Sequence, residues 1–94
     1  MNKYTECLNN ECFFTGIPGE YCERHHIFYG SANRKLSEKY GMKVYLAPLY
    51  HRLTPFGVHV NRSNDILVKQ YGQREFEALH GHDKFMKTFG KNYL

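Results

Sequence analysis

The stretch YCERHHIFYGSANRKLSEKYGMKVYLAPLYH, residues 21–51, decides the fold, because two runs of strand-forming residues flank a polar segment. Residues 21–29 and 42–49 are rich in aromatic and aliphatic side chains, and each run predicts a strand. Successive side chains of a strand point to opposite faces. His25 and His26 therefore face opposite sides, or the strand ends there and both enter a site.

The polar segment between the two runs, residues 30–41, contains signals for a short helical turn. Ser31 and Asn33 are candidate N-caps, and Gly41 is a candidate stop signal. The second strand should end near Pro48, because proline cannot donate to a strand ladder. Residues 50–61 contain Pro55 and Gly57 and are predicted to be at least partly loop.

Two helices are predicted after this loop. The first begins among three N-cap candidates, and its apolar residues recur at helical spacing. Gly72 interrupts that pattern and costs about 1 kcal/mol relative to alanine, so the helix is expected to bend or split there. The second helix runs from a cap at Asp83 to Gly90. The cap candidates are Ser63, Asn64 and Asp65, and the apolar residues are Ile66, Leu67, Tyr71, Phe76, Ala78 and Leu79, then Phe85, Met86 and Phe89.

The composition indicates one α+β domain over residues 1–94, with residues 1–20 as an irregular lead-in. The 16% aromatic content helps so short a chain to form a core. No stretch has the composition of a signal peptide or of a membrane span. Three cysteines, an odd number, do not suit a secreted disulfide framework, so we expect a cytoplasmic protein with reduced thiols. The net charge of +4 favours an acidic partner.

Six histidines are present, and four of them carry the functional prediction. His25 and His26 close the first predicted strand, while His51 and His59 flank the loop after the second. A hairpin would bring these positions together, and histidine is the commonest metal ligand among side chains. His80 and His82 lie in a glycine-flanked junction and are interpreted as turn residues.

The segments ERHHIF and YH, with RHHIFYGSANRKLSEKYG, GVHVN and the terminal FGKNYL, resemble an HNH, or ββα-metal, endonuclease. The resemblance covers roughly residues 12 to 94. In more detail, these segments resemble small phage HNH proteins related to the RecA-dependent nuclease, or recombination-enhancement, group. It implies a small ββα-metal (His-Me finger) domain, with a β-hairpin followed by two C-terminal helices.

The resemblance also implies roles for individual residues. His25 would be a metal ligand and His26 the general base that activates water. His51 would be a further ligand, and His59 the last. Asn61 would orient the base or contact phosphate.

The implied chemistry is hydrolysis of DNA phosphodiester bonds with one divalent ion. A neutral imidazole with a pKa of about 6.5 accepts a proton from water at cellular pH. Imidazole ligands suit zinc, nickel and other transition metals, whereas magnesium prefers oxygen. The ligand set therefore leaves the identity of the physiological ion open among Mg, Mn, Ni and Zn. Basic residues near the site would contact phosphate, which favours DNA as the partner. These are Arg34, Lys35, Arg52 and Arg62.

The family resemblance suggests a phage- or prophage-encoded protein in a bacterial host cell, working in DNA processing or recombination. A recombinase filament is a further partner that the group suggests. No membrane partner is expected. Oligomeric state and sequence preference are left open.

Two departures from the family pattern matter. Many relatives hold a structural zinc with two Cys-x-x-Cys pairs, but the corresponding positions here are Cys12, Thr15, Ala47 and Tyr50. One thiolate cannot close a four-ligand zinc site, so no structural zinc is predicted, and apolar packing is expected to fill the space. The second strand also lacks the family's asparagine. A catalytically degenerate DNA-binding or partner-binding module is therefore the main alternative, and a structural metal-binding protein is another.

Overall fold

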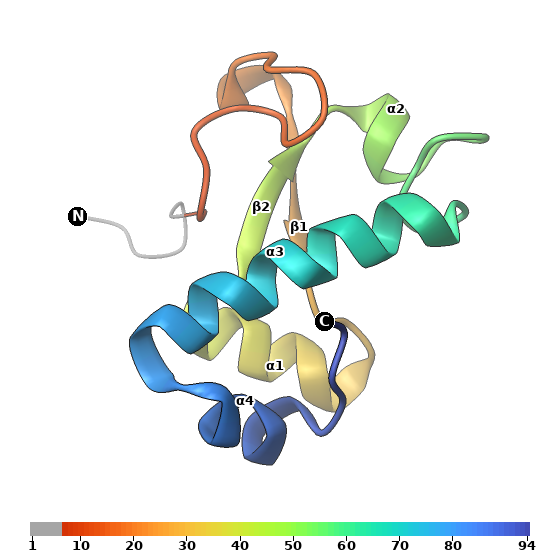
Figure 1. Ribbon diagram of the computed structural model, residues 1–94. Helices are drawn as coiled ribbons and strands as arrows, with labels where there is room; N and C mark the ends of the chain where they lie inside the picture. The colour runs from red at the N-terminus through yellow and green to blue at the C-terminus, as the bar shows by residue number, and fades with distance from the viewer. Residues whose placement is uncertain (1–6) are drawn as a thin grey trace.

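The computed structural model describes residues 7–94, which form an α+β arrangement around a pair of strands (Figure 1). This confirms the predicted class. The two predicted strands and the two predicted C-terminal helices are present, but one further helix lies between the strands and another follows the second strand. In chain order the elements are η2 (Gly19–Tyr21), β1 (Glu23–His26), α1 (Ser31–Tyr40), β2 (Lys43–Leu46), α2 (Pro48–His51), α3 (Arg62–His80) and α4 (His82–Phe89).

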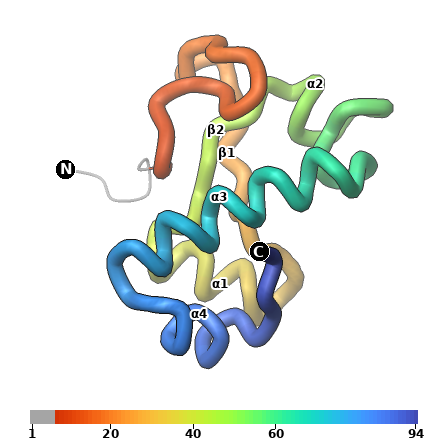
Figure 2. The backbone as a smooth tube through the Cα atoms, viewed as in Figure 1, coloured from red at the N-terminus to blue at the C-terminus, as the bar shows by residue number. Residues whose placement is uncertain are grey.

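Strands β1 and β2 pair antiparallel, as expected for the two arms of a hairpin. Both are shorter than predicted. The register places Glu23 opposite Leu46 and His26 opposite Lys43. The connection between the strands is the helix α1 rather than a short turn. Figure 2 shows the chain leaving β1, turning through α1 and returning along β2.

Helix α1 is a full helix of 10 residues, where the sequence suggested only a turn. Its N-cap is Gly30, at φ 95°, and not Ser31 or Asn33. Gly41 ends the helix in the left-handed conformation at φ 70°, as predicted. Buried Ser37 ties the helix to the chain after β1, because its hydroxyl donates to the Phe28 carbonyl and accepts from the Phe28 amide.

Helix α3 runs through Gly72 without a break, contrary to the prediction. A Cβ atom at this position would lie 2.9 Å from Cδ1 of Ile27. The glycine therefore allows α3 to pack closely against the chain that follows β1. The cap of α3 is Asn61, whose side-chain oxygen accepts from the Asn64 amide, and not one of the three predicted residues.

The core lies between the strands, α3 and α4, as the crossing of α3 over the strands in Figure 1 suggests. The predicted face of α3 is partly wrong, because Leu67 and Leu79 are exposed and Val68, which was not predicted, is buried. Phe76 is buried as predicted. In α4, Phe85 and Phe89 are buried as expected, but Gly81 rather than Asp83 caps the helix.

The C-terminal segment is held by one buried side chain of α3. The amide nitrogen of Gln73 donates to Oδ1 of Asn92, and its oxygen accepts from the Tyr93 amide. The tail that follows α4 is therefore part of the fold and packs Tyr93 against the core.

Of the predicted lead-in, residues 1–6 lie outside the described part of the chain. Residues 7–22 contain η2 and an isolated bridge between Glu11 and Pro18, and are otherwise irregular. The predicted aromatic packing near Cys12 is confirmed, because Phe14 stacks on Tyr50 at 4.9 Å between ring centroids. The Ala47 amide donates to Sγ of Cys12.

Candidate metal centre and adjoining groove

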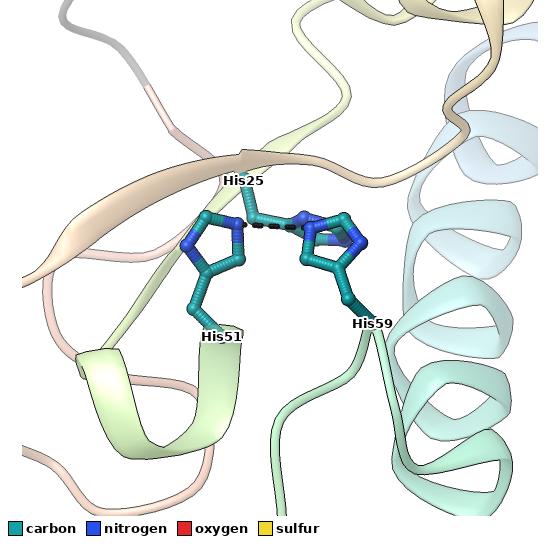
Figure 3. Close-up of side chains that lie close together, drawn as sticks. All are labelled: His25, His51 and His59. Atoms are coloured by element: carbon teal, nitrogen blue, oxygen red, sulfur yellow. Dashed lines mark hydrogen bonds between the residues drawn. The ribbon is translucent and has the colours of Figure 1, made fainter. Parts of the chain in front are cut away.

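Three imidazoles from three segments of the chain converge on one another (Figure 3). His25 lies on β1, His51 ends α2, and His59 lies in the loop before α3. One ligand nitrogen of each lies within 4.8 Å of the others. They form the one group of three or more such side chains that could hold a metal ion within residues 7–94.

The backbone after β2 explains why His51 and His59 meet. The amide of Val58 donates to the Tyr50 carbonyl at 2.8 Å, and the amide of His59 donates to the His51 carbonyl at 3.3 Å. Gly57 permits this closed loop, since a Cβ atom there would lie 2.8 Å from the backbone of Arg52 and Leu53.

His25 is the buried member of this group, with 2% of its surface exposed. Its Nε2 atom is buried and has no hydrogen-bond partner. Burial, reinforced by the neighbouring imidazoles of His51 and His59, lowers the pKa of His25 to about 3. A buried polar atom without a partner is costly, and a neutral imidazole nitrogen is the form that binds a metal ion.

The geometry fits a cation with nitrogen ligands. Nε2 of His51 and Nε2 of His59 lie 3.2 Å apart. Two ligands of a tetrahedral zinc ion at about 2.0–2.1 Å would be separated by about 3.3 Å. Three protein ligands leave a fourth position open, which is the pattern of catalytic rather than structural sites.

Glu23 orients one of the three clustered imidazoles, that of His51, through a hydrogen bond. Its Oε1 accepts from Nδ1 of His51 at 2.7 Å, and both of its carboxylate oxygens contact Nε of Arg52. The hydrogen bond from His51, followed by the contact with Arg52, lowers the pKa of Glu23. Because a carboxylate only accepts, this bond fixes the proton of neutral His51 on Nδ1 and leaves the Nε2 lone pair toward the centre.

His26 faces away from the three-histidine centre, as strand alternation predicts. It lies opposite Lys43 in the register, and its Nε2 donates to Oε1 of Glu38 at 2.8 Å. A cavity of about 280 Å³ is nevertheless lined by His26 together with all three clustered histidines. His26 and the centre therefore open onto the same space at the end of β1.

Two further cavities extend this space into a groove. One, of about 530 Å³, is lined by His26, Ser31, Arg34, Lys35 and Glu38. The other, of about 250 Å³, is lined by Arg24, His26, Arg34, Glu38 and Lys43. His26 and Arg34 line all three cavities, so the three adjoin.

The predicted phosphate-binding residues are distributed unevenly around this groove. Arg34 and Lys35 line it. Arg52 is engaged with Glu23, and Arg62 is the exposed first residue of α3. Arg24 was missed by the sequence analysis, although it lies two residues before His26 and so on the same face of β1.

Asn61 has a structural role that the sequence analysis did not foresee. Its oxygen caps α3, and its Nδ2 donates to the Pro55 carbonyl. The role predicted for Asn61, orienting His26 or contacting phosphate, stays a prediction beside this capping role. His80 and His82 lie at the end of α3 and the start of α4, on either side of Gly81. The His80 ring packs against Phe76 in a tilted arrangement, and His82 pairs with Glu77.

The aromatic ring of Tyr29 lies beside the three-histidine centre. Its centroid lies 5.5 Å from that of the His25 ring and 5.1 Å from that of the His59 ring. Nζ of Lys69 lies 4.4 Å from the Tyr29 ring centroid and pairs with Asp65 at 2.9 Å. Helix α3 thereby packs against the centre through a cation–π contact.

No family model, no curated protein and no solved structure matches this chain. None of the helices within residues 7–94 is both long and apolar enough to cross a membrane.

Proposed function

We propose that this protein is a metal-dependent DNA endonuclease of the HNH, ββα-metal type. The observation that supports this most directly is the shared cavity. It joins three imidazoles suited to a cation, a further histidine outside that group, and the side chains of Arg24 and Arg34. The sequence resemblance to phage HNH proteins supports the same class, and it alone suggests a role in phage DNA processing or recombination.

Each part of this site has a task in phosphodiester hydrolysis. His26 accepts the proton of the attacking water. Arg24 and Arg34 contact phosphate oxygens and hold the strand in the groove. His25, His51 and His59 would hold a divalent ion, which would supply neutralisation of the phosphoryl charge and stabilisation of the leaving 3′ oxygen. The buried His25 side chain and the ring of Tyr29 exclude water from one side of the proposed metal site.

The test is nicking of supercoiled plasmid by the purified protein with magnesium, manganese, nickel or zinc. We expect nicking with at least one of these ions. His26→Ala should abolish nicking while retaining the ion, because His26 is outside the ligand group. His25→Ala should lose both the ion and the nicking.

His82→Ala is the matched control, since His82 pairs with Glu77 away from the groove and should leave nicking unchanged. Plasmid that stays intact with all four ions, while the protein still shifts DNA, would contradict the nuclease and favour the DNA-binding module. A protein that needs the ion to fold but ignores DNA would favour the structural metal-binding protein.

A further inference from the structure

We infer that Glu38 is a positioning residue for the reaction, which sets the orientation and tautomer of His26 and is itself anchored by Lys43. This inference rests on the proposed endonuclease function. Oε1 of Glu38 accepts from Nε2 of His26 at 2.8 Å, and its Oε2 accepts from Nζ of Lys43 at 3.1 Å. The two carboxylate oxygens thus have separate partners.

Lys43, which anchors Glu38, is the most buried of the three residues in this series of contacts. The Lys43 side chain is 3% exposed, whereas those of His26 and Glu38 are 19% and 38% exposed. Lys43 lies opposite His26 on the neighbouring strand, so both side chains reach the Glu38 carboxylate from adjacent positions of the sheet. Contacts with His26 and Lys43 lower the pKa of Glu38, so the carboxylate stays ionised and accepts on both sides.

The tautomer follows from these contacts. A carboxylate accepts and does not donate, so the Nε2 atom of neutral His26 carries the proton. The lone pair then lies on Nδ1, the ring nitrogen that Glu38 does not occupy. A general base needs its lone pair held in one direction before water arrives, and a fixed partner on the other nitrogen does this.

The position of Glu38 argues for a task beyond joining two elements. Its side chain lines the two cavities that share His26 and Arg34 with the cavity of the three-histidine centre. Helix α1 is already tied to the chain after β1 through the Ser37 hydroxyl, which makes two hydrogen bonds to Phe28. The fold therefore has a buried link at this junction that does not depend on Glu38.

The chain offers a matched control for a glutamate–histidine pair. Glu77 accepts from Nδ1 of His82 at 2.7 Å, between α3 and α4. Glu77 also accepts from Nε2 of buried Gln73, so the control removes the histidine and keeps the glutamate. His82→Ala breaks a similar contact at residues that do not line the groove. It therefore serves beside Glu38→Ala, and Glu38→Gln keeps an acceptor oxygen at the original position.

The experiment combines histidine-ring ¹⁵N NMR of the full chain with plasmid nicking at saturating ion. In the wild type we expect the Nε2–H tautomer for His26. Glu38→Ala should give mixed tautomers and a turnover lowered about 10- to 100-fold, with ion affinity and KM for DNA nearly unchanged. Glu38→Gln should recover part of the turnover, and His82→Ala should match the wild type.

The outcomes separate this inference from the nuclease itself. A wild type that nicks DNA, loses nicking in His26→Ala and keeps it in Glu38→Ala would overturn the positioning role alone. An Nδ1–H tautomer in the wild type would overturn it without any activity measurement. A wild type inactive with every ion, although folded and loaded, would overturn both proposals.

Discussion

Oε1 of Glu23 lies 2.7 Å from Nδ1 of His51, so a carboxylate on β1 supports an imidazole at the end of α2. Glu23 and His25 are two residues apart and share one face of the strand. The same face therefore supplies one ligand and the support of another. Carboxylates that hold the second nitrogen of a ligating histidine fix its tautomer and raise its basicity.

Replacing Glu23 should weaken metal binding. We expect Glu23→Ala to raise the dissociation constant for zinc or nickel about 10- to 100-fold, because His51 loses its fixed tautomer. Glu23→Gln should have a smaller effect, since its oxygen still accepts from Nδ1. Calorimetric titration measures both, with Glu11→Ala, a surface change on the lead-in, as the control. Equal affinities in all variants would show that the contact does not serve the centre.

Metal binding should stabilise the fold. A ligand that binds only the folded state adds about 2.7 kcal/mol at 100 times its dissociation constant, which raises the melting temperature by roughly 10–20 °C in a domain of this size. Thermal unfolding followed by circular dichroism, with and without zinc or nickel, measures the shift, and chelator should reverse it. His59→Ala should remove most of it, and His80→Ala should not.

The stability of the metal-free protein should depend on pH through His25. Its pKa is about 3 in the folded chain because of burial, against about 6.5 in an unfolded chain. Between these values the unfolded state holds a proton that the folded state lacks. The free energy of unfolding therefore falls as pH drops below about 6.5, by up to about 1.4 kcal/mol per unit, and His25 has no such effect above that pH.

Burial and His51 also lower the pKa of His59, which acts in the same direction. Urea unfolding between pH 5 and 7.5 in the presence of chelator measures the slope. His25→Gln should flatten it, because the variant has no group at this position that titrates in the range. A slope of equal size in His25→Gln would assign the effect to other groups.

The sequence was sufficient to predict the histidine cluster, because strand alternation and antiparallel pairing are local rules. His25 and His26 face opposite sides, and the loop after β2 returns His51 and His59 to β1. The same alternation would have identified Glu23 and Arg24. Glu38 carries no such signal, since it meets His26 only because the tertiary structure brings α1 against β1.

The helices were less predictable for reasons that lie in the tertiary structure. Gly30 caps α1 through its backbone, so no cap residue marks where this helix begins. In α3 the apolar Leu67 and Leu79 are exposed, while polar Asp65 and Gln73 are buried with partners from α3 and the C-terminal segment. Because these apolar residues are exposed and these polar residues are buried, the hydrophobic periodicity of the sequence does not identify the buried face of α3.

Gly72 should be required for packing although it lies in a helix. Gly72→Ala would gain up to about 1 kcal/mol in helix propensity. It would also place a Cβ atom 2.9 Å and 3.0 Å from two methyl carbons of the fully buried Ile27. Overpacking of this kind costs about 1–3 kcal/mol, so we expect a net loss of about 1 kcal/mol.

Urea unfolding measures this loss, and exposed Ala78 provides the control on the same helix. Ala78→Gly should lower the free energy of unfolding by about 1 kcal/mol through propensity alone. If Gly72→Ala proves more stable than the wild type, the approach of α3 to Ile27 is looser than the structure indicates.

Arg24 and Arg34 should contribute to DNA binding through phosphate contacts. Both line the cavity that also contains the three clustered histidines, so a bound strand passes within their reach. Each duplex phosphate contact contributes about 0.9 to the slope of log affinity against log salt. Arg24→Ala and Arg34→Ala should each lower that slope by about one and weaken binding at low salt, with little dependence on DNA sequence.

Fluorescence anisotropy of a labelled duplex at several salt concentrations measures the slope. Arg74 is exposed on α3 and is not among the residues lining the three cavities, so Arg74→Ala is the matched control. It removes the same charge from the whole molecule, and a general attraction would therefore weaken equally in all three variants. A larger slope change for Arg24→Ala and Arg34→Ala would place the strand in the groove beside His26, where the proposed hydrolysis needs it.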